Sequence, residues 1–212
     1  QAALEARLRE QLGAVATRRR FGGRLLVQPE GIPTGADRPF KVFTPFWKAL
    51  QASIRIPDPA PEPRALVPAP TLKSDSIDAW DLHPNKPDWS TGFGEMWTPG
   101  EPGARKRLRE FLAGPIAGYT ENRKLPAEDS TSRLSPYLHF GEISPHQVWR
   151  AARQTEESGV APAREVQKFL SEIAWRDFSH HLLYHDPEMG RLSWRRQFEA
   201  VEWRKGTKSE LE

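Results

Sequence analysis

Residues 162–184 read PAREVQKFLSEIAWRDFSHHLLY and predict the longest helix of the chain. At about 100° per residue, five apolar side chains fall within one arc and predict a buried face. These five are Val166, Phe169, Leu170, Ile173 and Ala174. The opposite arc carries Glu172, Trp175, Arg176 and Ser179. A tryptophan in the middle of a polar arc is expected to pack on another element or on a planar ligand.

The polar arc of this helix has two interpretations. In the first, the helix packs on both sides, and Glu172 and Arg176 form an ordinary surface ion pair at i,i+4 spacing. In the second, the arc is the wall of a ligand site. Trp175 would then offer a flat surface, Glu172 would accept hydrogen bonds from base edges and Arg176 would pair with an anion. The helix alone leaves both interpretations open.

A second candidate site is the run Thr131-Ser132-Arg133-Leu134-Ser135-Pro136, immediately before another predicted helix. It offers three hydroxyls and an arginine beside the unpaired amides of a helix N-terminus, a combination that holds phosphate well. The alternative is an ordinary helix cap.

Three histidines, His180, His181 and His185, stand near the end of the long predicted helix. His181 and His185 lie one turn apart, but no glutamate occupies the general-base position of a zinc-protease helix and no third ligand is evident. We therefore expect these histidines to serve capping and packing, and we expect no metal site.

The composition of the 212 residues is that of a polar globular protein, with no cysteine. This excludes disulfides, cysteine-ligated zinc and thiol nucleophiles. No apolar run approaches the roughly 18 residues of a membrane helix, and no signal peptide is visible, so we expect a cytoplasmic protein. The formal net charge of +3 is compatible with nucleic acid without requiring it, and the eight tryptophans form either core or stacking surfaces.

The first 53 residues predict the last part of an α/β domain. The predicted elements are a helix over residues 2–13 with Leu4, Leu8 and Leu12 on one stripe, a short buried strand at residues 25–27, and a helix from Phe46 to Ala52 that follows Thr44 and Pro45. One short strand makes no sheet, so these elements cannot form such a domain alone.

Residues 57–99 contain nine of the 20 prolines and predict a long connector, because proline lacks an amide donor and favours extended neighbours. Its aromatic residues predict that the second half of the connector lies packed on a surface, since disordered linkers are poor in aromatics. These residues are Trp80, Trp89, Phe93 and Trp97.

From residue 98 onward the pattern is helical. The signals are a capping box at Thr98 and Glu101, an apolar stripe of Leu108, Phe111 and Leu112, and helix starts at Ser135 and at Ser144, the latter with Gln147 completing a capping box. We therefore predict a mostly α fold in three parts. Residues 1–53 form the C-terminal part of an α/β domain, residues 54–100 an inter-domain connector and residues 101–212 the N-terminal part of a helical domain.

Three motifs of this chain, in this order, resemble the photolyase/cryptochrome family. PFKVFTPFW (residues 39–47) is similar to the segment that closes the α/β domain of the family. TSRLSPYLHFGEISP (residues 131–145) looks like the signature at the start of its flavin-binding domain, and EIAWRDFSHHLLYH (residues 172–185) resembles the helix that follows. The resemblance covers essentially the whole chain and is most like the class I photolyases of cyclobutane pyrimidine dimers.

The resemblance implies that FAD binds in the helical domain. By resemblance, its phosphate and ribitol part would be held by Tyr119, Thr131, Ser132, Arg133, Leu134 and Ser135. Phe169 and Arg176 would lie beside the flavin, although Phe169 stands where several members of the family carry tryptophan. An antenna chromophore of the folate or deazaflavin type is also implied, with contacts outside this chain.

The resemblance further implies DNA containing pyrimidine dimers as the substrate. Glu172 and Trp175 would face a flipped-out dimer as catalytic and DNA-binding residues, and Arg123 would contact a backbone phosphate. Glu172 favours cyclobutane dimers, because relatives that repair the 6-4 photoproduct tend to carry glutamine there. Reduced, light-excited flavin then splits the dimer by electron transfer, so no side chain need act as an acid or base.

The leading hypothesis is a photolyase fragment that is inactive alone, because the chain begins at Gln1 in a helical pattern and about half a pocket leaves the flavin exposed. The rest of its own polypeptide is then a candidate partner. The alternative is a cryptochrome photoreceptor without repair activity. A third hypothesis is a flavin-free helical scaffold that binds DNA through Arg18–Arg20 and Arg123, in a salt-sensitive manner and without preference for damage.

Overall fold

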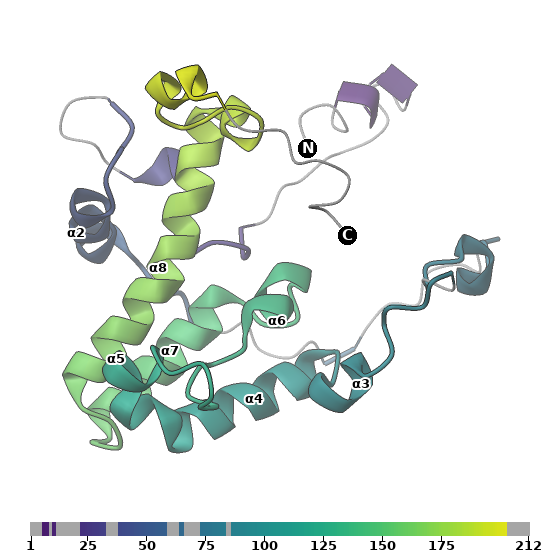
Figure 1. Cartoon of the computed structure of the whole chain (residues 1–212). Coiled ribbons are helices and arrows are strands. Elements are labelled where there is room, and N and C mark those ends of the chain that lie inside the picture. Colours follow the sequence, from purple (N-terminus) through teal and green to yellow (C-terminus); the bar gives the residue numbers. More distant parts are fainter. Residues whose placement is uncertain are drawn as a thin grey trace.

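The computed structural model describes residues 6–8, 10–11, 22–32, 38–58, 64–65, 73–83 and 86–202, and in this part the chain is mostly helical with no β-strand (Figure 1). The α-helices are α2 (Phe43–Ser53), α3 (Phe93–Met96), α4 (Glu101–Ala113), α5 (Tyr119–Asn122), α6 (Ser135–Phe140), α7 (Pro145–Glu157) and α8 (Ala163–His185). Short 3-10 helices lie at Pro29–Gly31, Ile77–Trp80, Pro115–Gly118, Pro187–Gly190 and Arg196–Ala200. The mostly α prediction is confirmed, and the division into three parts stays a prediction.

Helix α8 is the element against which α2, α5 and α7 all pack (Figure 1). It extends over 23 residues because residues 163–185 contain neither glycine nor proline. The predicted buried face is confirmed, since its five apolar side chains are all buried: Val166, Phe169, Leu170, Ile173 and Ala174. These side chains join one core with apolar residues of α2, α4, α6 and α7.

Helix α4 buries the predicted apolar stripe of Leu108, Phe111 and Leu112. The predicted capping box is wrong, because the N-cap is Gly100 and no side chain caps the helix. The first turn instead packs directly on the chain before it. A Cβ atom placed on Gly103 would lie 1.8 Å from the carbonyl oxygen of Thr98, so glycine is required at this position.

Helices α6 and α7 begin where the sequence predicts. Helix α7 has the predicted capping box, in which the hydroxyl of Ser144 accepts from the amide of Gln147 and the Gln147 side chain accepts from the amide of Ser144. Helix α6 begins at Ser135 without a side-chain cap and ends at Gly141, whose φ of 76° is left-handed. The tight turn at Gly141 leads the chain from α6 into α7.

The strand predicted at residues 25–27 is absent. Leu25 and Leu26 are buried as expected, but no strand of the described residues pairs with them. Side chains take the place of that strand: the amides of Leu26 and Val27 both donate to Oδ2 of Asp177, at 2.7 and 3.1 Å. The backbone is therefore satisfied without a ladder, and the segment follows an irregular path over α8.

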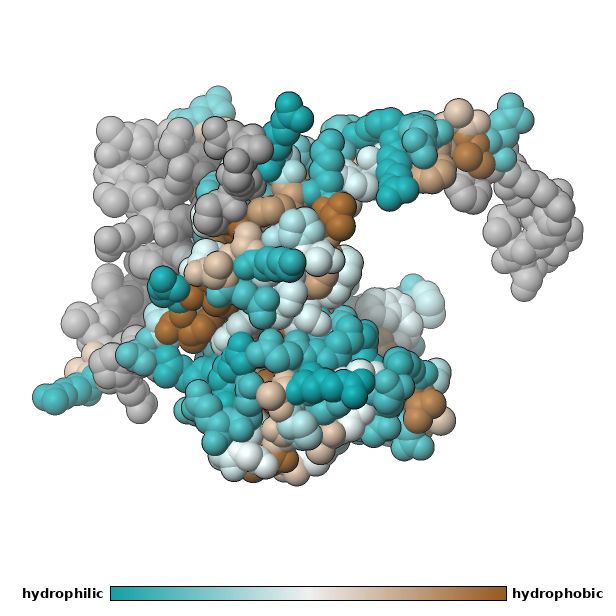
Figure 2. Space-filling view, turned by 90° about the vertical axis from the view of Figure 1, so that its left-hand side faces the viewer, coloured by the Kyte–Doolittle hydropathy of each residue, from teal (hydrophilic) through white to brown (hydrophobic). Residues whose placement is uncertain are grey.

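Helix α2 begins three residues earlier than predicted, at Phe43. Thr44 and Pro45 lie inside its first turn, where proline is tolerated because the amide it lacks would be unpaired. The N-cap is Val42, which makes no side-chain cap. The helix buries Phe46 and Leu50 and is held against α8 by these apolar side chains. Seen from the side on which α2 lies, the described surface is mostly hydrophilic, with separate hydrophobic patches (Figure 2).

The predicted packing of the aromatic residues in the connector is mostly wrong. Trp80, Trp89 and Phe93 are each more than half exposed, and only Trp97 packs against the core among these four. Figure 1 shows why: the chain between about residues 75 and 90 extends away from the helical body.

The predicted N-terminal elements lie mainly outside the described residues. Residues 6–8 and 10–11 are helical, as expected for a helix over residues 2–13, but Leu4 and Leu12 are outside the described part, as is the basic cluster Arg18–Arg20. In the part of the chain that is described, no helix is long and apolar enough to span a bilayer.

The upstream segment, defined as residues 22–32 and 38–40, is bound to the helical body through its backbone. Besides Asp177, Nε2 of His181 accepts from the amide of Phe40 at 3.0 Å, and Nε2 of His146 lies 2.9 Å from the carbonyl oxygen of Leu26. Asp177 and His181 are 2% and 1% exposed. Four backbone groups far from α8 in the sequence thus depend on three buried or half-buried polar side chains.

Burial shifts the pKa of two of these side chains, Asp177 and His181. It raises the pKa of Asp177 to about 7, although the amides of Val27 and Leu26 and the nearby Arg176 act in the opposite direction. Burial, and then the neighbouring His185, lower the pKa of His181. One oxygen of Asp177, Oδ1, is buried without a hydrogen-bond partner in the described residues.

The replacement Gly103→Ala is expected to destabilise the protein by about 1–3 kcal/mol, because the new methyl group overlaps the Thr98 carbonyl and α4 must shift. Chemical denaturation measures the change. Gly94→Ala is the matched control, since no atom lies within 4 Å of its Cβ position and alanine is the better helix former. Equal stability of the two variants would contradict the close approach.

The stability of the protein is expected to fall as the pH rises from about 4 to about 7, relative to Asp177→Asn. In this window the folded protein retains a proton on Asp177 that the unfolded chain has released, so folding is favoured at the lower pH. The difference in unfolding free energy should change by up to about 1.4 kcal/mol per pH unit. The contribution of His181 cancels in this comparison. A flat difference across the window would show that Asp177 is ionised in the fold.

Candidate functional site

The carboxylate of Glu172 lies between two cations on the polar side of α8. Nη1 of Arg123, at the end of α5, donates to Oε1 at 2.8 Å, and Nζ of Lys168 donates to the same oxygen at 2.7 Å. The Glu172 side chain keeps 25% of its exposure, so it is reached by solvent. Oε2 receives no hydrogen bond within the described residues, and this oxygen is available to accept from a ligand.

The ion pair between Glu172 and Arg176, which belonged to the first of the two interpretations of this arc, does not form. Nη1 of Arg176 donates to the carbonyl oxygen of Arg24 at 2.5 Å, and Nη2 makes a longer contact of 3.5 Å to the carbonyl of Leu138 in α6. The upstream segment and α6 thus draw the guanidinium away from Glu172. Burial lowers the pKa of Arg176, and the carboxylate of Asp177 opposes this effect.

Trp175 packs on another element, one of the two outcomes expected for it. Its ring is stacked on Phe43 of α2, with a centroid distance of 3.9 Å and an interplanar angle of 9°. The edge of Phe178 also contacts it, at 5.6 Å. Because Trp175 is nevertheless 43% exposed, this stack supports the indole in a fixed orientation while leaving part of it open to a ligand.

The side chains of Tyr119 in α5 and Phe169 in α8 are buried. Phe169 is 1% exposed and is enclosed by Phe111 and Tyr119, with centroid distances of 4.8 and 5.5 Å. Burial raises the pKa of Tyr119, although Arg123, whose guanidinium lies 5.7 Å from the ring centroid, acts in the opposite direction. The ring of Tyr119 therefore lies beside Arg123, the partner of Glu172, and Phe169 packs against that ring.

The run from Thr131 to Ser135 is held from behind by Arg107 of α4. This guanidinium donates to the carbonyl oxygens of Thr131 and Ser132 at 2.7 and 3.1 Å, and to both oxygens of Asp129 at 2.7 and 3.2 Å. Asp129 also pairs with Arg133 at 2.9 Å. Leu134 is 1% exposed and anchors the run in the core.

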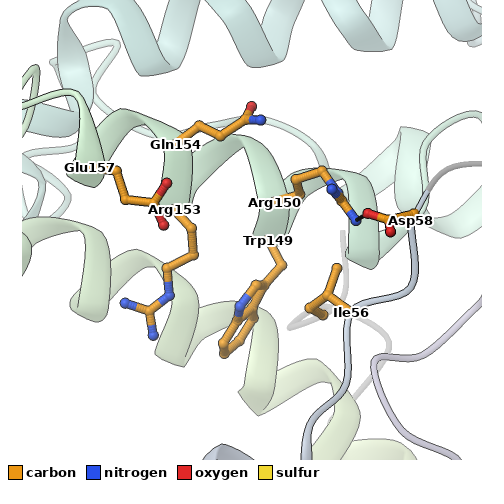
Figure 3. Close-up of a pocket in the computed structure, with 7 residues that line it drawn as sticks. All are labelled: Ile56, Asp58, Trp149, Arg150, Arg153, Gln154 and Glu157. Carbon is orange, nitrogen blue, oxygen red and sulfur yellow. Dashed lines mark hydrogen bonds and ion pairs between the residues drawn. The ribbon is translucent and has the colours of Figure 1, made fainter.

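A pocket of about 360 Å³ lies between α7 and the chain after α2 (Figure 3). Trp149, Arg150 and Arg153 of α7 line it together with Ile56 and Asp58. Its arginines are already paired, Arg150 with Asp58 and Arg153 with a glutamate of α7. None of the site residues predicted from the sequence lines this pocket, which is separate from the polar side of α8.

The histidines of α8 take part in packing. His181 and His185 have ring centroids 4.5 Å apart, and Nδ1 of His180 lies 2.9 Å from the carbonyl oxygen of Arg176. Among the described residues, no three histidine, cysteine, aspartate or glutamate side chains are grouped so as to hold a metal ion.

Sequence reasoning missed three contributors to the site: Lys168, Phe43 and Arg107. The spacing of Lys168 and Glu172 is the same i,i+4 spacing that suggested Arg176, so this partner was detectable. Phe43 contacts Trp175, 132 positions away, and Arg107 contacts Ser132, 25 positions away. No local pattern signals such contacts.

Comparison with known proteins gives consistent matches. The family model described as DNA photolyase matches residues 1–64. The chain is 43% identical over 195 residues to the deoxyribodipyrimidine photo-lyase of Agrobacterium fabrum, an alignment that covers 91% of this chain and 40% of that protein. It is 27% identical to Cryptochrome-1 of Arabidopsis thaliana, over 80% of this chain and 26% of that protein. The chain thus spans about two fifths of the photo-lyase.

A solved structure matches the fold over nearly the whole chain. It is the crystal structure of a bacterial class III photolyase from Agrobacterium tumefaciens, with a TM-score of 0.86, 42% identity and coverage of 98% of this chain and 42% of that one. The expected likeness to class I photolyases is therefore corrected, because this relative belongs to class III.

Simultaneous replacement of Phe43 and Trp175 by alanine is expected to be non-additive, with a coupling energy of about 0.5–1.5 kcal/mol from their stacked rings. A double-mutant cycle of unfolding free energies measures it. The control cycle combines Phe43→Ala with Trp89→Ala, an exposed residue outside this contact, and should be additive. Additivity in both cycles would mean that the stack adds nothing to stability.

Proposed function

Over most of its length this chain is homologous to deoxyribodipyrimidine photo-lyases of the photolyase/cryptochrome family, and on this premise we propose that it contributes to the light-driven repair of cyclobutane pyrimidine dimers in DNA. The observation that carries the proposal is the pairing, on one side of α8, of a partly open indole with a carboxylate that retains a free oxygen. A pyrimidine dimer needs both, a flat surface and an acceptor for its base edges.

In this proposal, Trp175 and Glu172 bind the extruded dimer. The stack with Phe43 holds the indole of Trp175 in place, so little rotational freedom is lost when a base packs against it. Glu172 accepts a hydrogen bond through Oε2, while Arg123 and Lys168 hold its other oxygen. The carboxylate thus keeps one orientation.

Arg123 and Lys168 have a second role in the proposal, since both are partly exposed cations beside the dimer site. We assign Arg123 to the phosphate backbone of the DNA, where a basic side chain fixes position without reading sequence. Its bond to Glu172 then links the backbone contact to the base contact.

The residues of the run Thr131–Ser135 fit the diphosphate of FAD. Thr131 and Ser135 are exposed hydroxyls, and Arg133 is a partly exposed cation. Arg176 would lie beside the flavin. Tyr119 and Phe169 are buried, so we assign them to support of the site rather than to direct contact. When bound, reduced FAD supplies the electron that splits the dimer, and this chain's residues bind and orient its phosphates.

The proposal extends to partners and chromophores beyond the described residues. The substrate is DNA that contains pyrimidine dimers. An antenna chromophore of the folate or deazaflavin type is proposed for the photo-lyase as a whole, with no contact assigned here. Further sequence beyond these 212 residues is the proposed source of the remaining flavin contacts, because binding sites normally enclose most of a ligand.

The replacement Trp175→Ala is expected to reduce the preference for dimer-containing over undamaged oligonucleotide by about 1–3 kcal/mol, the contribution of one stacked base. Fluorescence anisotropy with both oligonucleotides measures the preference. Trp89→Ala, which removes an exposed tryptophan of the connector, should leave it unchanged. Arg123→Ala should weaken the binding of both oligonucleotides and reduce the salt dependence of binding, with a further loss for the dimer-containing one because Glu172 loses a partner that orients it.

Two outcomes would overturn the proposal. Binding without preference for the dimer in the unaltered chain would favour the flavin-free scaffold. A dimer preference that survives Trp175→Ala would place recognition elsewhere. The cryptochrome alternative predicts weak binding to both oligonucleotides.

A further inference from the structure

Arg107 contacts the proposed phosphate-binding run only through backbone oxygens. Nη2 donates to the carbonyl of Thr131 and Nε to the carbonyl of Ser132, two consecutive peptide groups. The Arg107 side chain is only 18% exposed, and it belongs to α4, 24 and 25 positions before these two residues in the sequence. Such a contact fixes the orientation of the peptide planes rather than the choice of side chains.

Asp129 fixes Arg107 in turn. Its two oxygens accept from Nη1 and Nη2, at 3.2 and 2.7 Å, in the bidentate geometry that planar guanidinium and carboxylate groups share. Four hydrogen bonds therefore hold one guanidinium, which offers five donors in all. The cation cannot turn toward solvent without breaking both contacts to the run.

The fixed carbonyls determine where the adjacent amides point. In a planar trans peptide the N–H is directed opposite to the C=O, so the amides of Ser132 and Arg133 face away from Arg107. Neither amide has a hydrogen-bond acceptor among the described residues. Arg133 has a φ of 50°, and Leu134 after it is right-handed, an alternation that turns the amide of Arg133 to the same side as the amides of Leu134 and Ser135.

We propose that Arg107 is a positioning residue for the diphosphate of FAD: by holding the carbonyls of Thr131 and Ser132, it directs the amides of Ser132 and Arg133 at the phosphate oxygens. This role rests on the proposed function, in which the run Thr131–Ser135 holds that diphosphate. A cation on the carbonyl side also polarises the two peptide groups, which strengthens their amides as donors.

Lysine cannot replace arginine in this role. Its ammonium is a single point, whereas the planar guanidinium reaches two carbonyls and two carboxylate oxygens at once. Arg107→Lys therefore keeps the charge and removes the geometry. Arg105→Lys is the matched control, because Arg105 lies on the same helix, is exposed and, among the described residues, pairs only with Glu101.

The test compares three probes on the full 212-residue chain: inorganic pyrophosphate, FAD and riboflavin, with binding measured by calorimetry and the unfolding temperature measured in parallel. Arg107→Lys is expected to weaken the binding of pyrophosphate and of FAD by about tenfold, because one set of charge-assisted hydrogen bonds is lost. Riboflavin, which has no phosphate, should bind both proteins equally. Arg105→Lys should change none of the three.

The outcomes separate this inference from the proposed function. An unaltered chain that does not bind pyrophosphate, or that binds it equally well after Arg107→Lys, overturns the role of Arg107. A general loss of structure would weaken riboflavin as much as FAD and would also overturn it. Pyrophosphate binding that depends on Arg107, in a chain that prefers riboflavin to FAD, would sustain the positioning role and refute the assignment of the run to FAD.

Discussion

The carboxylate of Asp177 is the interaction on which the arrangement of this chain depends. It sits on the central helix α8 and accepts from two consecutive amides of a segment 150 positions earlier in the sequence. An isolated irregular segment has no β-ladder to satisfy its backbone, and unsatisfied buried amides are costly. Through Asp177, α8 satisfies these backbone amides in addition to supplying apolar side chains to the core. The residues that face the proposed ligand site lie on the same helix.

Much of the helical part could be predicted from local patterns. The apolar arc of α8 and the stripe of Leu108, Phe111 and Leu112 follow from helical periodicity, which depends only on neighbouring residues. The capping box at Ser144 was equally local and formed as expected. The predicted capping box at the start of α4 is wrong because the backbone of Thr98 closely approaches the helix at Gly103, and only the folded geometry reveals that approach.

The sequence predicted that Glu172 and Trp175 share one side of a helix, but it did not predict the side chains that contact them. Glu172 and Trp175 lie together on the exposed side of α8, but the partners of Glu172 proved to be Arg123 and Lys168, whereas Arg176 turned to backbone carbonyls. Several cations lay within reach of this carboxylate, and spacing along one helix cannot rank them. Segments outside α8 bring Arg123 to Glu172 and provide the carbonyl of Arg24 to which Arg176 donates. No local pattern encodes the approach of these segments.

The contact between the upstream segment and α8 has a consequence for how this sequence can vary. Its donors and acceptors on one side are peptide groups, which every residue except proline supplies equally. Evolutionary substitution at positions 26, 27 and 40 is therefore limited by side-chain size and by the exclusion of proline. The specific side-chain chemistry of these hydrogen bonds comes from Asp177 and His181. The upstream side of this contact should therefore tolerate many substitutions, whereas Asp177 and His181 should tolerate few. Because the peptide groups do not change with the residue type, covariation between residues would give little signal for this buried contact.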